Sequence, residues 1–510
     1  MKPKKILYLL VALLLAFNPV FSQKKEITVV QKESVVGKNL FNGSDIKGVE
    51  YVFSDKVYNY FVDTATHLLT VQLRNIGLDG VSLKNKGAMV QYDIINDQIL
   101  WTKEIDYSMT TILQISNAMI YRLGRTSYNI DVYTGNHIWE TASIIFFFDL
   151  INKIAMGTLP FSDIVLDGID FSNGKPLWNR IIKNKYGLNN YFLINDSTML
   201  IVANGLHTVN IYNGKGWSYF TETGEVSFFI GFCNNIVSNA LIDSSSVFLA
   251  AKNEIFKIDI QSGNLLWQNY FPEKWASKSS IFSYDTTIYM INKGYVNLLS
   301  YGYSDLKYGK PFIAAFDKQT GEQRYLKFAD HRGRFIQSFG VFGDALFLVF
   351  SDKISKFDLK TGNLISEKVF KRKEIGELKY FASERVFMTN YFGNMQFLPE
   401  HNFPTLHVFN DFDELLTIDD QFKVTNIVKK KDIWIYYFGS KDLAFFYNES
   451  AIGNNTLVIN NDGEKIAELK LSSKAFFSND VVYDIKGRNF IAIDFQDIIS
   501  SYCRWLTPNE

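Results

Sequence analysis

The residue types that most often carry out chemistry are sparse in this sequence. Its 510 residues include only 2 cysteines, Cys233 and Cys503, and 6 histidines. The histidines are His67, His137, His207, His331, His401 and His407. None of them has the spacing of a common zinc-binding pattern, and neither a G-x-S-x-G nucleophile turn nor an H-E-x-x-H motif is present. We therefore expect no catalytic residues and no metal site.

An acidic turn is the next candidate for chemistry, because Asp259 and Gly263 in "IDIQSGNLLW" could by themselves form a phosphate or metal loop. The pattern recurs, however, at Asp93, Asp131, Asp170, Asp259, Asp317 and Asp358. The residues eight positions later are Trp101, Trp139, Trp178, Trp267, Tyr325 and Ser366. Glycine stands at the fourth position after the Asp in all but the first copy, as Gly135, Gly174, Gly263, Gly321 and Gly362. Weaker copies lie at Val209–Trp217, Val408–Leu416 and Val458–Ile466.

Recurrence at intervals near forty residues indicates a structural repeat rather than a ligand loop. Alternating apolar positions, rich in β-branched and aromatic residues, predict strands on both sides of each turn. The glycine supplies the positive φ that a tight hairpin needs, and the tryptophan packs against a neighbouring unit. Because one such sheet cannot bury its own faces, radial repetition must cover them. We predict an all-β fold, a single β-propeller of four-stranded antiparallel blades.

The D-x-x-[ST]-G-x-x-x-W motif of these turns resembles the repeat of the PQQ-like β-propellers. That family contains quinoprotein dehydrogenases and a lipoprotein of the outer-membrane barrel-assembly machinery. The resemblance covers roughly Asp45 to Trp505 and implies about eight blades, in a range of about 7–10. In the quinoprotein enzymes the cofactor lies between a tryptophan and two adjacent cysteines, beside Ca²⁺. This sequence has no adjacent cysteines, so we predict no cofactor and do not expect PQQ.

The N-terminus predicts export. Residues 1–22 combine three early lysines, an apolar stretch and small residues before Gln23, which is typical of a cleaved signal peptide. Residues 23–44 then form an N-terminal segment that could supply a ring-closing strand, and residues 45–510 form the propeller. We expect a periplasmic or secreted protein without a membrane span. In that compartment Cys233 and Cys503 could form one bridge or remain two buried thiols.

The balanced overall charge gives no reason to expect a highly charged binding partner. Lysine and arginine total 53, aspartate and glutamate also total 53, and no basic surplus favours nucleic acid. The runs Lys371–Glu374 and Lys429–Asp432 are short and end in an acid, so we interpret them as solvated hairpin ends. The segment His331–Arg334 could hold an anion or be a charged loop.

Three connections between second and third strands look long, and long loops on a rigid scaffold often bind partners. They are Arg74–Ala88, Lys293–Pro311 and Tyr391–Pro404, and all three should lie on the face opposite the glycine hairpins. Their candidate binding residues are Arg74, Asp79, Tyr295, Asn297, Tyr301, Tyr303, Tyr308, Tyr391, Phe392 and Asn394.

The sequence thus predicts an exported, non-catalytic propeller that binds a protein or glycan through one loop-rich face. It would act as a monomeric scaffold or as part of an envelope complex. The alternative is an enzyme built on the propeller, either a quinone-dependent oxidoreductase or a polysaccharide-acting enzyme.

Overall fold

The chain divides into two compact units in the computed structural model. Unit 1 consists of Met1–Val36, Asp45–Ser108 and Lys474–Glu510, and unit 2 consists of Gly37–Ser44 and Met109–Ser473. The structure describes residues 27–77, 79–80, 82–160, 164–182, 190–203, 205–221, 237–251, 254–271, 278–300, 303–308, 310–330, 334–382, 386–389, 395–397, 405–439, 443–448, 455–460, 463–496 and 498. The predicted signal peptide and both cysteines lie outside these residues.

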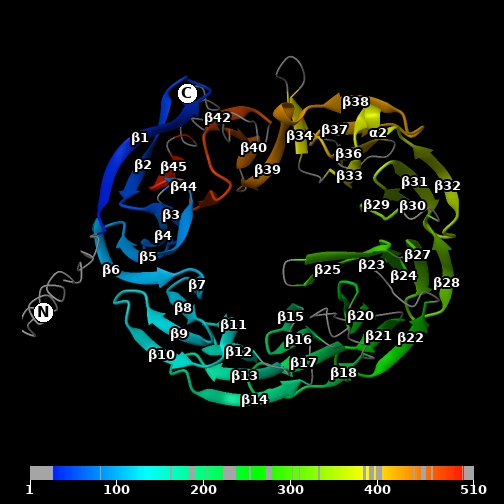
Figure 1. The fold of residues 1–510 in the computed structure, drawn as a ribbon, viewed down its shortest axis with the longest axis horizontal. Coiled ribbons are helices and arrows are strands. Elements are labelled where there is room, and N and C mark those ends of the chain that lie inside the picture. The colour runs from blue at the N-terminus through cyan, green and yellow to red at the C-terminus, as the bar shows by residue number, and fades with distance from the viewer. Residues whose placement is uncertain are drawn as a thin grey trace, which may run out of the picture. The chain divides into compact units, whose positions relative to one another are not determined.

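Unit 1 is built from antiparallel strands of both ends of its sequence (Figure 1). One of its sheets contains β3 (Lys56–Asp63), β4 (Leu68–Ile76), β5 (Leu83–Asp93) and β6 (Gln98–Asp106). In the other, β2 (Asp45–Phe53) pairs with β45 (Asn489–Asp494), followed by β44 (Val481–Lys486) and β43 (Phe476–Ser478). An N-terminal strand therefore completes a sheet made of the last strands of the chain.

Unit 2 begins with sheets whose four strands follow one another in the sequence. The first contains β7 (Thr110–Ile115), β8 (Ala118–Leu123), β9 (Thr126–Asp131) and β10 (His137–Thr141). The second contains β11 (Ile144–Asp149), β12 (Ile154–Pro160), β13 (Ile164–Asp170) and β14 (Pro176–Ile182). The third contains β15 (Asn190–Asn195), β16 (Thr198–Ala203), β17 (Gly205–Asn210) and β18 (Ser218–Phe220). The fourth contains β19 (Leu241–Asp243), β20 (Ser246–Ala251), β21 (Glu254–Asp259) and β22 (Leu265–Tyr270).

The later sheets of unit 2 carry insertions. The fifth contains β23 (Ser279–Tyr284), β24 (Thr287–Asn292), β27 (Phe312–Asp317) and β28 (Gln323–Phe328), with the separate hairpin β25 (Tyr295–Ser300) and β26 (Tyr303–Tyr308) inserted. The sixth contains β29 (Ser338–Phe342), β30 (Ala345–Val349), β31 (Lys353–Asp358) and β32 (Leu364–Val369), and the short helix α2 (Arg372–Ile375) follows it. The seventh contains β33 (Leu378–Phe381), β36 (Leu406–Asn410), β37 (Leu415–Ile418) and β38 (Val424–Val428).

The last strands of unit 2 share one sheet. In spatial order its strands are β35 (Met395–Phe397), β34 (Val386–Thr389), β39 (Ile433–Gly439), β40 (Leu443–Asn448), β41 (Asn455–Asn460) and β42 (Lys465–Leu469). The 3-10 turn η1 (Lys430–Asp432) precedes β39. The end of β1 (Val29–Asn39) pairs with β42, with Gly37 opposite Leu469. This repetition of four-stranded antiparallel sheets is that of a β-propeller, as predicted, while the number of blades stays a prediction.

The recurrent Asp shapes the hairpin between the third and fourth strands of a sheet. The Asp259 carboxylate accepts hydrogen bonds from the N–H and the hydroxyl of Ser262, both at 2.7 Å. The N–H of Gly263, whose φ is 76°, donates to the Asp259 carbonyl at 2.9 Å. Backbone N–H groups of the turn likewise donate hydrogen bonds to the carboxylates of Asp93, Asp131, Asp170, Asp317 and Asp358.

An aromatic ring on the fourth strand joins its sheet to the turn of the next sheet. The indole N–H of Trp267 donates to the Lys318 carbonyl at 3.3 Å. Its ring lies so close to Gly321 that an added Cβ would stand 2.5 Å from the ring. The equivalent pairs are Trp139 with Gly174, Trp178 with Gly214, Trp217 with Gly263, and Tyr325 with Gly362. Each of these rings also donates its N–H or O–H to a backbone carbonyl of that next turn.

Trp217 takes a full part in this series although the sequence ranked its segment among the weaker copies. The side-chain oxygen of Asn210 replaces the carboxylate and accepts from the N–H groups of Tyr212 and Asn213 at 3.0 and 3.2 Å. Trp217 stands seven rather than eight positions after that residue. An amide oxygen can cap the same turn as a carboxylate, so a pattern restricted to Asp underestimates the repeat.

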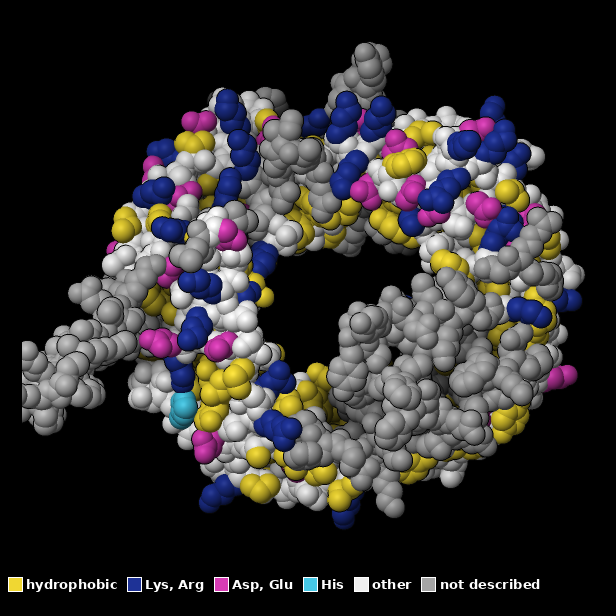
Figure 2. Space-filling model, in the orientation of Figure 1, with side chains coloured by type: hydrophobic (Ala, Val, Ile, Leu, Met, Phe, Trp, Pro, Cys, Tyr) yellow, Lys and Arg dark blue, Asp and Glu magenta, His cyan; other side chains and the backbone are white. Residues whose placement is uncertain are grey.

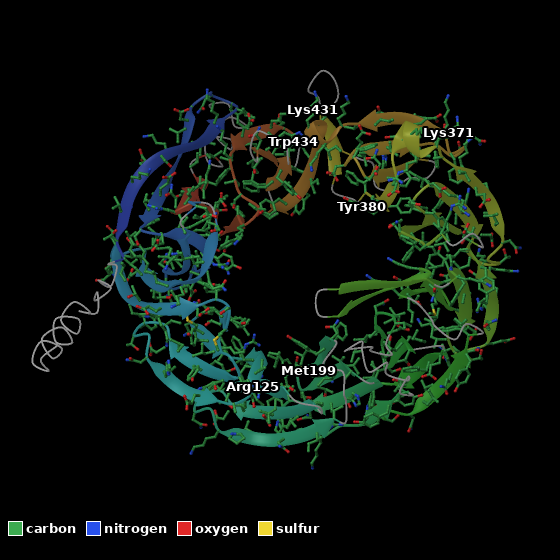
Figure 3. The ribbon with its side chains drawn as sticks, in the orientation of Figure 1. Arg125, Met199, Lys371, Tyr380, Lys431 and Trp434 are labelled. Carbon is green, nitrogen blue, oxygen red and sulfur yellow. The ribbon has the colours of Figure 1, made fainter. Side chains whose placement is uncertain are left out.

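Apolar side chains fill the space between neighbouring sheets. Met199 on β16 is fully buried and packs with Ile154 and Met156 of β12 (Figure 3). Burial on this scale is the main favourable contribution to the folding of each sheet pair. No described helix is long and apolar enough to cross a membrane.

Trp267→Ala should destabilise the protein severely. The side chain is only 7% exposed, and its loss leaves a large cavity between two sheets, which costs about 3–5 kcal/mol of unfolding free energy. Thermal and urea unfolding measure the effect. Tyr270→Ala on the same strand, where the side chain is 57% exposed, is the control and should change stability by no more than about 0.5 kcal/mol. Equal effects of the two substitutions would contradict the inter-sheet role of Trp267.

Acid should destabilise the protein partly through its turns. Hydrogen bonds from the Ser262 and Thr361 side chains lower the pKa of Asp259 and Asp358 below the ordinary 3.8. Carboxylates with a lowered folded-state pKa stabilise the fold above about pH 3.8, and this contribution disappears as the pH falls through the folded-state pKa. The double variant Asp259→Asn, Asp358→Asn keeps the turn acceptors, as Asn210 does, without titrating. Its melting temperature should fall less steeply than that of the wild type between about pH 5 and pH 2, and identical slopes would refute the assignment.

Candidate functional site

Arg74, the first of the predicted binding residues, lies on an aromatic and cationic surface of unit 1. It stands on β4 opposite Lys56 of β3. Its guanidinium carbon is 4.8 Å from the ring centroid of Tyr58 and 5.4 Å from that of Tyr107. Its Nε donates to the Lys84 carbonyl at 2.9 Å, which fixes the plane of the guanidinium group.

A β-bulge places Tyr58 beside Arg74. The pairing of β3 with β4 shifts between Val57 and Asn59, so Tyr58 is the extra residue of the bulge. Bulges redirect side chains, and here the ring remains 37% exposed. Lys474 approaches the same ring, with its Nζ 4.7 Å from the centroid, and donates a hydrogen bond to the Tyr58 carbonyl. The exposed ring is thus held by two cations.

Burial shifts the pKa of two neighbouring groups. The Tyr107 hydroxyl donates to the Leu73 carbonyl at 2.9 Å, and burial raises the pKa of Tyr107. Burial lowers the pKa of Lys474, and the charge of Lys56 lowers it further. We call Tyr58, Arg74, Tyr107 and Lys474 the Tyr58 surface. It offers an aromatic face and cationic groups together, which suits recognition of aromatic or anionic side chains.

The sequence could not have located this surface beyond Arg74. Lys474 and Tyr58 are 416 residues apart, and no local pattern marks either of them. The bulge that exposes Tyr58 is also silent in the sequence. Tertiary pairing alone brings the four residues together.

The predicted long loop at Arg74–Ala88 is wrong. The strands β4 and β5 continue through it, with Arg74 opposite Gly87 and Ile76 opposite Leu83. Only a short turn remains, in which the Asp79 carboxylate accepts from the N–H and hydroxyl of Ser82 at 2.9 and 2.8 Å. Asp79 therefore has a turn-forming role, because its carboxylate is engaged within its own loop.

The connection Lys293–Pro311 does join the second and third strands of a sheet, since β24 pairs with β27. It forms the hairpin β25–β26 rather than an irregular loop, with Tyr295 opposite Tyr308. Asn297 lies on β25, Tyr303 begins β26, and Tyr301 lies outside the described residues. Figure 1 shows the hairpin projecting away from β24 and β27.

The third predicted connection has a different strand order from that expected. Within it β34 pairs with both β35 and β39, whereas β33 pairs with β36. The candidates Tyr391, Phe392 and Asn394 lie outside the described residues. That the three connections share one face stays a prediction.

The histidines contribute no metal site in the described part of the chain, where no group of three or more His, Cys, Asp or Glu side chains could hold an ion. His207 on β17 is fully buried, and neither ring nitrogen has a hydrogen-bond partner. Desolvation, together with the charge of Arg180, lowers its pKa to about 3, so the ring is neutral. His137 packs against the Tyr128 ring, while His331 and His401 fall outside the described ranges.

The basic runs are solvated and paired. Lys371 forms an exposed ion pair with Glu374 at 3.0 Å, but on the helical turn α2 rather than on a hairpin (Figure 3). Lys430 pairs with Asp413 at 2.8 Å. Acidic and basic side chains are intermixed on the face seen in Figure 2, so this view gives no support for a polyanion-binding surface.

Arg334, the described residue of the His331–Arg334 segment, is committed to a carboxylate. Its Nε and Nη2 donate to the two oxygens of Asp352 at 2.7 and 2.9 Å, and this pairing lowers the pKa of Asp352. Beside it, Lys353 donates to Asp330 at 3.0 Å and to Glu367 at 3.1 Å. The network argues for the charged-loop interpretation over anion binding.

One family model matches part of this chain. Residues 80–269 match the family model described as "Outer membrane protein assembly factor BamB". The PQQ-like propeller repeat inferred from the sequence is thereby confirmed for this part of the chain. A search of curated proteins finds no match.

Solved structures show likenesses at low identity. BamB from Moraxella catarrhalis is 14% identical, with 70% of this chain and 96% of that chain covered and a TM-score of 0.32. A europium-containing methanol dehydrogenase is 9% identical, with 71% and 84% covered and a TM-score of 0.31. Quinohemoprotein alcohol dehydrogenase from Comamonas testosteroni is 12% identical, with 67% and 73% covered and a TM-score of 0.32.

Asp330→Asn should cost stability because it leaves the Lys353 charge without its buried partner. The two side chains are only 4% and 5% exposed, and breaking a buried pair costs about 3–5 kcal/mol. Asp344→Asn is the matched control, since the side chains of Asp344 and Lys360 are 56% and 65% exposed and exposed ion pairs contribute little to stability. Chemical unfolding of both variants measures the change in unfolding free energy. An unchanged unfolding free energy for Asp330→Asn would show that the network does not stabilise the fold.

Proposed function

We propose that this chain is an exported, non-catalytic propeller that binds a protein partner in the cell envelope through the Tyr58 surface. The observation that carries the proposal is the Tyr58 ring, exposed by a bulge and held between Arg74 and Lys474. Tyrosine and arginine are the residues most enriched where protein interfaces concentrate their binding energy. The bulge takes Tyr58 out of the regular strand pairing and leaves its side chain partly exposed, where a partner can reach it.

The family match supports the choice of compartment and of partner class. Its description names an outer-membrane assembly factor, and the residues before Gln23 have the pattern of a signal peptide. We further propose that the hairpin β25–β26 and the connection Tyr391–Pro404 contribute contacts, and that no quinone is needed. The experiment must also distinguish a protein partner from a glycan partner.

The test replaces Tyr58 by a photo-crosslinking amino acid in the native host and, separately, measures capture by Tyr58→Ala and Arg74→Ala. One envelope protein should crosslink at position 58 and should bind the purified wild type. Each alanine variant should bind it about tenfold or more weakly, as expected where an interface anchor is lost. Replacement of Tyr295–Tyr308 by two glycines, which keeps the connection between the paired ends of β24 and β27, should weaken the same complex.

Tyr284→Ala provides the control, because Tyr284 is exposed to the same 37% as Tyr58. It should leave capture unchanged, and Tyr58→Ala and Tyr284→Ala should keep the wild-type melting temperature. Undiminished capture by Tyr58→Ala would refute the site, and crosslinks confined to polysaccharide would replace the protein partner by a glycan.

A further inference from the structure

A groove in unit 2 is lined by residues of the sheet β11–β14 and by Thr141 and Ala142 at the end of β10. Its volume is about 490 Å³, and its walls include Leu159, Ile169 and Leu177. Its polar residues include Ser143, Asp167 and Asn179. A volume of this size can take a side chain or a small ligand.

Along β14 this side of the sheet is exposed, whereas Ile169 of β13 is buried against residues of the preceding sheet. Leu177 and Ile181 are 52% and 61% exposed, and Asn179 between them is also exposed. The alternate residues turn the other way, where Trp178 donates to the Ile211 carbonyl and Arg180 to the Thr208 carbonyl. β14 therefore presents an apolar, polar, apolar row to solvent, because successive strand residues face opposite sides.

Asp167 supplies a carboxylate at the centre of this row. It stands opposite Asn179 in the register of β13 and β14. One of its oxygens accepts a hydrogen bond from the Ser143 hydroxyl. Arg180 of the neighbouring strand is turned to the other face, where it donates to the Thr208 carbonyl. A carboxylate in an apolar groove favours a cationic ligand.

The free edge of β14 also allows another strand to be added. β14 is the terminal strand of its sheet. Elsewhere in unit 2, β42 pairs with β41 on one side and accepts a further strand on the other, where Gly37–Asn39 pair with Ala467–Leu469. Edge strands with exposed apolar side chains are the usual templates for strand addition.

We propose that this groove binds an extended peptide, added as a fifth strand beside β14, that carries a lysine or arginine with apolar side chains two residues before and after it. The apolar side chains would cover Leu177 and Ile181, and the cation would reach Asp167. Asp167 lies on β13, two strands from the added peptide and hence about 10 Å away. Only a long cationic side chain spans that distance across Asn179.

Fluorescence anisotropy with the full mature chain tests the proposal. The probe is a labelled peptide of sequence Thr-Val-Thr-Lys-Thr-Val-Thr with blocked ends. It should bind, whereas peptides with glutamate or the short cation 2,4-diaminobutyrate in place of lysine should bind at least about tenfold more weakly. Failure of the lysine peptide to bind, or equal binding of the three peptides, would overturn the proposal.

Protein variants locate the site. Asp167→Asn and Leu177→Ser should each weaken binding of the lysine peptide about tenfold or more. Ile365→Ser is the matched control, because Ile365 has the same place after its turn Asp on β32 and is 53% exposed. An effect of Ile365→Ser as large as that of Leu177→Ser would contradict the assignment. If Asp167→Asn does not fold, the comparison of Leu177→Ser with Ile365→Ser and the three peptides still test the proposal.

Two further measurements distinguish peptide binding in the groove from binding at the Tyr58 surface and from binding of a sugar. Tyr58→Ala should bind the lysine peptide like the wild type, so failure here is distinguishable from failure of the proposed function. Free glucosamine should not displace the peptide. Displacement by glucosamine together with no peptide selectivity would assign the groove to an amino sugar instead.

Discussion

The contact of an aromatic ring with the glycine of the next turn is the interaction on which the sheets of unit 2 depend. The ring of Trp178, for example, occupies the space where Gly214 lacks a side chain, and its N–H satisfies a carbonyl of that turn. Glycine is needed there twice, for its positive φ and for its lack of Cβ. The turn that shapes one sheet thus also receives the aromatic ring of the previous sheet. Local turn chemistry and inter-sheet packing are therefore a single constraint.

The series changes where the aromatic is missing. Ser366 occupies the aromatic position after the Asp358 turn, and the later turns use another scheme. In them the side-chain oxygens of Asn410 and Asn460 accept from the N–H groups of Glu414 and Glu464, both at 2.8 Å. The Asn side chains in turn donate to the carboxylates of those glutamates. The sheets that follow Ser366 are those with rearranged strand order, which is consistent with the loss of the ring that fixes one sheet against the next.

Surfaces available for binding lie where side chains are not used by these joints. On β14 one side is taken by Trp178 and Arg180, which hold the next sheet, while Leu177 and Ile181 on the other side remain exposed. On β3 a bulge removes Tyr58 from the regular pairing and exposes its ring. Because the Asp, Gly and aromatic positions of the repeat are occupied by architecture, recognition must use residues outside the motif.

The strands and hairpins of the repeat could be predicted from the sequence through most of the chain. An Asp, a Gly and an aromatic within ten residues suffice for this, because turn geometry and strand alternation are local properties. It identified Arg74 but mistook the paired strands around it for a loop, since pairing of β4 with β5 is not written in either strand alone. The contact of Lys474 with Tyr58 and the position of Asp167 opposite Asn179 became visible in the folded chain alone. Both contacts depend on strand register and on bulges, because a slip of one residue would turn each side chain to the opposite face.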